Sequence, residues 1–274
     1  MLRVSKLYVY PIKSLGGISL QEAMVAERGL LYDRRWMLID AHHRFLSQRQ
    51  QPRMALIQVH LTDDGLHVTH QGVRPLHIPF TQVYEQAETV AIWDDTCTAM
   101  LAPPMYHRWF SHVLGIECRL VYMPESTRRA VDPRYAPPGH IASFADAYPF
   151  LMIGQASLDD LNSRLETPLP INRFRPNIVF TGGQPYEEDR MGGFRIGPIR
   201  FHGVKLCARC VITTIDQQFG ERGKEPLKTL ATYRSKNNKT LFGQNLIHQG
   251  TGMIRVGDAI TVEYMHDDDR FVVF

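Results

Sequence analysis

The sequence contains few cysteines and no long apolar run. Four of its 274 residues are cysteine, too few for the disulfide framework of a small secreted protein, so we expect a reducing environment. No stretch reaches the roughly 20 apolar residues that a membrane-spanning helix requires. The first residues also lack the apolar core and cleavage site of a signal peptide. We therefore expect a soluble, cytoplasmic protein that does not contact a membrane.

An excess of charge of one sign is also missing. Lys and Arg number 31 against 28 Asp and Glu, which leaves a net charge of +3 spread along the chain. Nucleic-acid-binding proteins usually concentrate their basic residues in a stripe, so we expect no nucleic-acid partner, although a local cationic pocket is compatible with these numbers. The glycine-rich phosphate loops of nucleotide-binding α/β proteins are absent as well.

Short β-type segments dominate what is present. Alternating or β-branched apolar runs predict strands at residues 5–10, 34–40, 54–61, 65–70, 76–80, 177–180, 194–206, 211–216 and 259–265. Helical periodicity is confined to residues 103–115, 157–166 and 225–234. Strands and helices do not alternate regularly. The pattern predicts a β-rich α+β protein whose sheets are closed or barrel-like rather than parallel.

Residues at the ends of these segments predict boundaries. Met105 belongs to the apolar face expected for the first helix, and Gly115 is expected to end that helix. Ser157 is the expected N-cap of the second helix, with Asp160 in the capping-box position. Residues 124–140 are rich in Pro and Arg and have no apolar period, so they predict a long loop between two domains, residues 1–123 and 124–274.

Cys207 and Cys210 are three residues apart, and the residues alone leave several interpretations open. A dithiol redox pair prefers a helix N-terminus, whereas the residues that follow here are β-branched. A structural zinc site needs four ligands, and His202 would supply only one more. The remaining interpretations are a single metal-ligating thiolate, favoured by the neighbouring cation of Arg209, and buried inert thiols.

Several longer stretches resemble one known family, in the same order along the chain. They are YPIKSLGG, GLLYDRRWMLID, RQQPRMALI, YPFLMIGQASLDDLNSRL, NRFRPNIVFTGG, CARCVITTID, GKEPLKTLATYR and RVGD. Together they run from Tyr10 to Asp258 and are similar to the MOSC-domain proteins, specifically the molybdenum-cofactor reductases of the amidoxime-reducing-component type. The resemblance implies an N-terminal MOSC-associated β-rich domain over residues 1–123 and a MOSC β-barrel domain over residues 124–274, with the cofactor between them.

The resemblance also implies a cofactor, molybdenum bound to molybdopterin, and the residues that hold it. Cys210, the second cysteine of its motif, would be the metal ligand and a catalytic residue, whereas Cys207 would be only a neighbour. Asp146 would be a catalytic residue that relays protons close to the metal. The matched positions expected to bind the cofactor are Lys13, Ser14, Arg34, Arg175, Asn177 and Arg209.

Three positions depart from the family pattern. Ala147 and Tyr148 stand where relatives carry small hydroxyl residues, and Ala208 replaces a serine within the cysteine motif. These changes remove hydrogen-bonding groups that would contact the cofactor tail. They do not affect the expected metal ligand.

The activity implied by the resemblance is reduction of small N-hydroxylated substrates: hydroxylamines, amidoximes and N-hydroxylated base analogues. No cysteine follows Cys210, so we expect no iron–sulfur cluster in this chain and a separate electron-donor protein, of the ferredoxin or cytochrome type with its reductase. We expect a monomer that does not bind pyridoxal phosphate. The alternative is a non-catalytic or sulfur-carrying MOSC module that binds the cofactor or a persulfide on Cys210.

Overall fold

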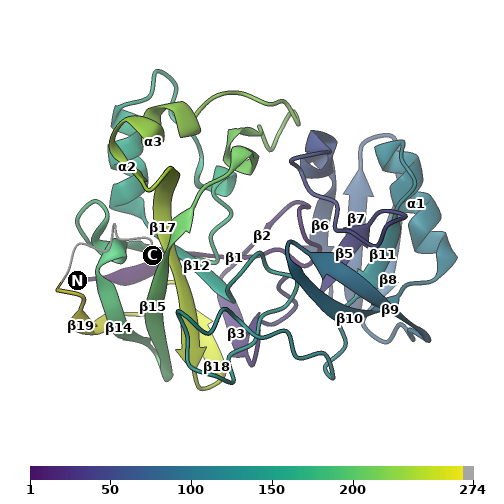
Figure 1. The fold of residues 1–274 in the computed structure, drawn as a ribbon, viewed down its shortest axis with the longest axis horizontal. Helices are drawn as coiled ribbons and strands as arrows, with labels where there is room; N and C mark the ends of the chain where they lie inside the picture. Colours follow the sequence, from purple (N-terminus) through teal and green to yellow (C-terminus); the bar gives the residue numbers. More distant parts are fainter. Residues whose placement is uncertain (268–274) are drawn as a thin grey trace.

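The computed structural model describes residues 1–267, which form two strand-rich lobes (Figure 1). The β-rich α+β class expected from the sequence is confirmed. Within this range no helix is long and apolar enough to span a membrane. The last seven residues of the predicted domain 124–274 lie outside the described residues.

A nine-stranded sheet forms the larger lobe. Its strands follow the order β19, β14, β15, β17, β12, β13, β1 and β2, and the short β16 pairs with β17. Their bounds are Arg3–Val9 (β1), Ile18–Leu20 (β2), Phe150–Gly154 (β12), Ile178–Thr181 (β13), Met191–Ile196 (β14), Ile199–Ala208 (β15), Ser235–Lys236 (β16), Lys239–Gln249 (β17) and Ile260–Met265 (β19). Only β12 and β13 are parallel neighbours in this sheet. Figure 1 shows β1, in purple, among the green and yellow strands of the C-terminal half.

Smaller antiparallel sheets complete the described part of the chain. One contains β18 (Gly252–Arg255), β3 (Glu22–Ala26) and β4 (Gly29–Leu30). A second contains β5 (Trp36–Ile39), β11 (Arg119–Tyr122), β10 (Asp95–Leu101) and β9 (Gln86–Ile92). A third contains β6 (Gln58–Leu61), β7 (Gly65–His70) and β8 (Val73–Pro79). The first of these joins strands from opposite ends of the sequence.

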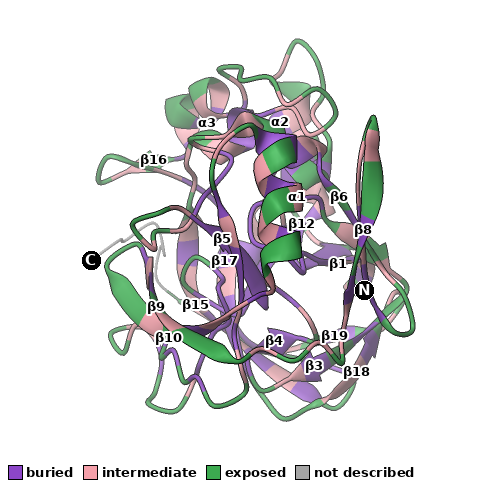
Figure 2. Cartoon of the chain, turned by 90° about the vertical axis from the view of Figure 1, so that its right-hand side faces the viewer, coloured by how far each residue is buried: buried purple, intermediate pink, exposed green. Residues whose placement is uncertain are grey.

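The α-helices of the described residues are α1 (Pro104–Leu114), α2 (Gln155–Ser163) and α3 (Leu227–Tyr233). Four short 3₁₀ segments accompany them: Pro52–Leu56, Ile171–Arg173, Glu187–Asp189 and Val211–Thr214. As predicted, α1 ends at Gly115, whose φ of 69° is the left-handed conformation that glycine adopts readily. The inward position predicted for Met105 is wrong, because its side chain is 54% exposed. Figure 2 shows that α1 has an exposed outer side and a buried inner side.

The predicted start of α2 is also wrong. The N-cap is Gly154, so Ser157 lies inside the first turn rather than before it. The Ser157 hydroxyl donates to the buried carboxyl of Glu188 at 2.7 Å, and that carboxyl also accepts the Gly154 amide at 3.1 Å. A side chain that is distant in the sequence therefore satisfies the helix N-terminus, which the local capping pattern did not reveal.

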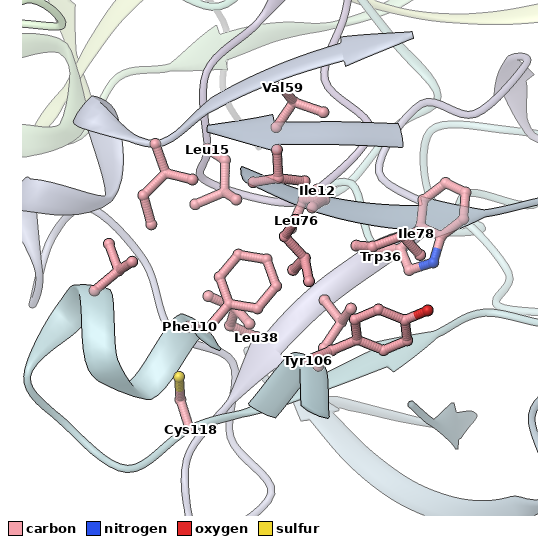
Figure 3. Close-up of a cluster of buried hydrophobic side chains, with 14 of the residues drawn as sticks. Ile12, Leu15, Trp36, Leu38, Val59, Leu76, Ile78, Tyr106, Phe110 and Cys118 are labelled. Atoms are coloured by element: carbon pink, nitrogen blue, oxygen red, sulfur yellow. The ribbon is translucent and has the colours of Figure 1, made fainter. Parts of the chain in front are cut away.

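The smaller lobe has an apolar core built around α1 (Figure 3). Tyr106 and Phe110 of α1 pack against Trp36 and Leu38 of β5. The same cluster includes Ile12 and Leu15, from the loop between β1 and β2, together with Val59, Leu76, Ile78 and Cys118. This loop thereby connects the apolar core of one lobe to the sheet of the other.

Residues 124–140 form neither a helix nor a strand, in agreement with the predicted loop. Arg129 within this stretch is buried and donates to the carbonyl oxygens of Ser143 and Ala145 at 3.0 and 2.7 Å. The loop is thus held against the segment that precedes β12. The predicted boundary between residues 123 and 124 remains a prediction.

Candidate functional site

A cavity of about 420 Å³ is lined by residues of both lobes. Its wall includes the ends of β15 and β17, the loops before β2, β5, β12 and β13, and the turn between β9 and β10. The structure brings all eight predicted site residues to this wall: Lys13, Ser14, Arg34, Asp146, Arg175, Asn177, Arg209 and Cys210. These residues come from five separate segments of the sequence, so their convergence is a property of the fold.

The cavity wall carries a strong excess of positive charge. Its acidic side chain is Asp146. The basic side chains are Lys13, Arg34, Arg175, Lys205, Arg209 and Lys239. A nearly neutral chain has thus concentrated cations around one hollow, as binding of an anionic ligand requires.

Arg34 and Arg175 both pack against the ring of a buried tyrosine, Tyr10. Their guanidinium carbons lie 4.3 and 4.2 Å from the ring centroid of Tyr10, within the range of cation–π attraction. The Tyr10 hydroxyl donates to the carbonyl oxygen of Pro176 at 3.0 Å, and burial raises the pKa of this phenol. Both arginines have positive φ values, 49° and 56°, which are uncommon for residues with a side chain. The packing around Tyr10 fixes both side chains in place.

Asn177 connects one of these cations to the backbone. Its Oδ1 accepts from Arg34 Nη1 and from the Leu151 amide, both at 3.2 Å, and its Nδ2 donates to the Tyr8 carbonyl oxygen at 3.2 Å. Arg34 Nη1 also donates to Asp33 Oδ2 at 2.6 Å, and the Asp33 side chain is only 1% exposed. Burial raises the pKa of Asp33, and the charge of Arg34 counteracts that effect. Asn177 and Asp33 thus position Arg34.

Lys13 and Asp146 form an ion pair at the cavity wall. Lys13 Nζ lies 2.6 Å from Asp146 Oδ1 and 2.7 Å from the Phe144 carbonyl oxygen. Burial lowers the pKa of Lys13 to about 8, although the neighbouring carboxylate opposes this shift. Desolvation would raise the pKa of Asp146, but the charge and hydrogen bond of Lys13, followed by the charges of Arg49 and Arg34, hold it well below its usual range. At neutral pH the pair therefore consists of a carboxylate and an ammonium that can release its proton.

The two motif cysteines have different surroundings. Cys207 Sγ accepts from Arg209 Nη1 at 3.0 Å, and Arg209 Nη2 donates to the Phe174 carbonyl oxygen at 2.6 Å. Arg209 thus contacts Cys207, because residues two apart in extended chain point to the same side. Its expected role in cofactor binding stays a prediction. Cys210 Sγ instead lies 3.8 Å from Nη1 of Arg49.

The strand predicted for residues 211–216 is wrong as well. Val211–Thr214 form a 3₁₀ turn in which the hydroxyls of Thr213 and Thr214 donate to the carbonyl oxygens of Cys210 and Val211, at 3.0 and 2.8 Å. Local bonds of this kind compete with strand pairing. Within residues 1–267 no three His, Cys, Asp or Glu side chains converge as metal ligands, which disfavours the structural-zinc interpretation.

Sequence reasoning missed two residues beside Cys210 and Asp146. The guanidinium of Arg49 lies 4.0 Å from the Trp93 ring centroid, and Trp93 Nε1 donates to Asp146 Oδ1 at 3.2 Å. Trp93 is 50% exposed and has a φ of 57° at the turn between β9 and β10. Arg49 lies in one of the stretches that carry the family resemblance, but neither residue has a local pattern that predicts its position.

Comparison with known proteins identifies relatives over most of the chain. The MOSC N-terminal beta barrel domain matches residues 1–117, and the MOSC domain matches residues 140–261. Mitochondrial amidoxime-reducing component 1 of Mus musculus is 34% identical over 94% of this chain and 81% of its own length. The Homo sapiens protein of the same name is 32% identical over 94% of this chain and 82% of its own length. Molybdenum cofactor sulfurase of Arabidopsis thaliana is 30% identical over 90% of this chain, but the match covers only 33% of that protein.

These comparisons correct one expectation and confirm another. The cytoplasmic location expected from the sequence is wrong, because the relatives that match 94% of the chain are named as mitochondrial proteins. Cysteine content and apolar runs do not indicate the compartment in which a protein resides, so the location inferred from them was wrong. The family resemblance, in contrast, is confirmed by both domain matches and by the identity over nearly the whole length. The chain therefore belongs to the MOSC-domain family, in the group of the amidoxime-reducing components.

Proposed function

We propose that this chain is a molybdenum-cofactor-dependent reductase of N-hydroxylated compounds: hydroxylamines, amidoximes and N-hydroxylated base analogues. The observation that carries the proposal is the convergence of the eight predicted residues on one cationic cavity that also contains the Cys210 side chain. The names of the mouse and human relatives support the same activity.

The polar atoms of the cavity fit molybdopterin. Arg209 Nε and the Tyr148 hydroxyl are buried and have no hydrogen-bond partner within residues 1–267. Unpaired buried donors are costly in a protein interior, so a ligand that accepts hydrogen bonds would stabilise both. The anionic, hydrogen-bonding tail of molybdopterin is such a ligand, with Arg34, Arg175 and Asn177 beside it. The Cys210 thiolate would ligate the metal, since soft thiolates suit a redox-active centre.

The chain's own residues would supply protons to the reaction. When bound, the molybdenum centre supplies the two electrons that break the N–O bond. Two protons are also consumed, and the amine, amidine or base leaves together with one water. Lys13 carries a proton on Nζ, and its lowered pKa of about 8 makes transfer easier than from an ordinary lysine. Asp146 is ionised in this pair, so we assign it the task of orienting Lys13 within the proton relay, while solvent water returns each proton that Nζ gives up.

The partners belong to the same proposal. Electrons would come from a separate protein of the ferredoxin or cytochrome type with its reductase. The enzyme would act as a monomer on a small N-hydroxylated substrate. The cofactor would lie between the proposed domains 1–123 and 124–274, since the cavity wall includes residues from both.

Matched cysteine variants test the proposal. Cys210→Ser should reduce turnover of benzamidoxime by the loaded enzyme to near background, because the metal loses its protein ligand. Cys207→Ser should reduce it far less than Cys210→Ser does, because Cys207 is only a neighbour of the ligand. The measurement is turnover per bound molybdenum with a chemical electron donor. An equal loss in the two variants would contradict a single ligand at position 210.

The second candidate is a sulfur-carrying module. It is favoured by the match to molybdenum cofactor sulfurase, although that match covers a third of the relative. In this case protein purified from a cofactor-competent host would carry a persulfide on Cys210 without stoichiometric molybdenum. Mass spectrometry and elemental analysis of one preparation separate the two functions.

A further inference from the structure

Trp93 is the aromatic residue of the cavity wall that leaves a large part of its ring accessible. The other aromatic residues on the wall, within the described part of the chain, are Tyr148, Phe150 and Phe174, and all three are buried. Trp93 is 50% exposed. An exposed indole keeps a large apolar surface in water, and burying that surface against a ligand is favourable. Trp93 therefore offers the cavity a flat, apolar binding surface.

The backbone at this position favours a functional reason for the exposed ring. Trp93 and Asp94 form the two-residue turn between β9 and β10, and Ile92 and Asp95 are paired on either side of it. Trp93 adopts a φ of 57°, which glycine or asparagine would adopt at lower cost in such a turn. Strained residues of this kind are concentrated at ligand-binding sites. The turn thus presents a bulky ring where a small residue would fit the backbone better.

Three contacts hold the exposed ring in one orientation. Trp93 Nε1 donates to Asp146 Oδ1 at 3.2 Å. The guanidinium carbon of Arg49 lies 4.0 Å from the centroid of the Trp93 ring. The centroid of the Phe45 ring lies 5.3 Å away, with the two rings tilted by 59°. A side chain that is already fixed loses little conformational entropy when a ligand packs against it, so this ring is preorganised for binding.

The Trp93 ring also lies beside the groups that carry the proposed chemistry. Arg49, which packs on the ring, places its Nη1 3.8 Å from Cys210 Sγ. Asp146, which accepts the indole N–H, is the ion-pair partner of Lys13. A substrate whose N–OH group lies close to Cys210 and Lys13 would therefore have the rest of its structure next to Trp93.

We propose that Trp93 is a specificity-determining residue whose ring stacks on the flat part of the substrate. It would favour aromatic amidoximes and N-hydroxylated bases over aliphatic hydroxylamines. The inference rests on the proposed function and specifies the substrate class within it. Aromatic rings and nucleobases stack well on an indole because two flat π surfaces contact each other over a large area. An aliphatic hydroxylamine has no such surface and gains little from Trp93.

Two substitutions at position 93 separate stacking from the hydrogen bond to Asp146. Trp93→Leu removes the planar ring, whereas Trp93→Tyr keeps one, and both remove the indole donor. The quantity measured is the ratio of kcat/KM for benzamidoxime to kcat/KM for N-methylhydroxylamine, in which metal content and electron supply cancel. The ratio should fall about tenfold in Trp93→Leu and less than about threefold in Trp93→Tyr. An unchanged ratio in Trp93→Leu, or equal falls in both variants, would overturn the proposal.

Binding without turnover gives a second readout, because the enzyme cannot reduce benzamidoxime when no electron donor is present. Benzamidoxime should quench the tryptophan fluorescence of the wild type, and most of this quenching should be lost in Trp93→Leu. The control is Trp109→Phe, because Trp109 lies on α1 outside the cavity, and this variant should keep the quenching. Equal quenching in Trp93→Leu and wild type, or none in the wild type, would contradict a stacking surface at Trp93.

The two measurements distinguish failure of this inference from failure of the proposed function. If the wild type carries no molybdenum and reduces neither compound, the proposed function is wrong, and quenching that depends on Trp93 still decides whether the ring binds a flat ligand. If the wild type reduces both compounds but the ratio does not change in Trp93→Leu, the proposed function stands and the role of Trp93 is refuted.

Discussion

The apolar core around α1 and the cationic cavity are neighbouring regions that bury opposite kinds of side chain. One loop supplies both: Ile12 and Leu15 belong to the core, whereas Lys13 and Ser14 between them line the cavity. Ser14 adopts a φ of 68°, so the loop keeps an unfavourable backbone conformation while its flanking residues are fully buried. The apolar core thus anchors the loop whose polar residues line the cavity. We therefore expect substitutions in the two regions to have different effects on unfolding free energy and on cofactor content.

The largest effect on stability is expected in the core. Phe110 is fully buried, so Phe110→Ala should lower the free energy of unfolding by about 3–5 kcal/mol, measured by denaturant titration. Molybdenum per folded molecule should stay at the wild-type level, because Phe110 does not line the cavity. Met105→Ala on the exposed side of the same helix is the control and should change stability by less than about 0.5 kcal/mol. A large loss of metal in folded Phe110→Ala protein would show that the two regions are not separable.

A smaller loss of stability, combined with loss of cofactor, is expected in the cavity. Arg34→Gln leaves the buried carboxylate of Asp33 without its ion-pair partner, which should cost about 3 kcal/mol of unfolding free energy, the low end for a buried pair because Arg34 is 14% exposed. It should also lower the pterin content several-fold. The double variant Asp33→Asn/Arg34→Gln should recover most of the stability, because no unpaired charge remains, but not the pterin content. If the double variant regained both, Arg34 would serve only to neutralise Asp33.

The smallest expected effect is a pH dependence of the unfolding free energy that comes from Glu188, a buried acid outside the cavity. Burial, followed by the nearby charge of Asp189, raises the pKa of Glu188 from 4.5 to about 7. Between these values the folded protein keeps a proton that the unfolded chain releases, so stability from this group is present below pH 4.5 and is lost as the pH rises to about 7. Relative to wild type, Glu188→Gln should thus gain on the order of 2 kcal/mol between pH 5 and pH 8. Unfolding titrations of both proteins at the two pH values measure this difference.

Comparing the two proteins is essential for this last measurement. Burial lowers the pKa of His248 to about 4, and this group makes the folded protein more stable as the pH rises from about 4 to 6.5. That contribution is the same in wild type and variant, and it cancels in the difference. A difference that stays constant between pH 5 and pH 8 would contradict the raised pKa of Glu188.

The sequence predicted the fold where short-range patterns decide it. The strand at β1 ends before Pro11, and α1 ends at Gly115, because a proline or a left-handed glycine acts within one or two residues. One prediction failed because a distant partner decides: Glu188, rather than a local cap, satisfies the start of α2. Another failed because local bonds from the Thr213 and Thr214 hydroxyls compete with strand pairing at residues 211–214.

The site also contains residues that sequence motifs reveal and residues that they do not. The eight predicted residues were found through matched motifs, and the fold brings all of them to one cavity. Arg49, Trp93 and Lys205 were missed because each reaches the site only through tertiary packing. The exposed turn that carries Trp93 resembles any other polar turn in the sequence. No pattern in the neighbouring residues predicts that Trp93 contacts Asp146.

The pairing of β1 with β13 and of β3 with β18 has a consequence for biosynthesis. The first strand to leave the ribosome is also one of the last to find its complete set of neighbours, since β13 is translated about 170 residues later. An expression fragment that begins at residue 124 would lack both early strands and would leave β13 and β18 as open edges. Such edges pair readily with other chains, so fragments of this protein should aggregate where the intact chain folds.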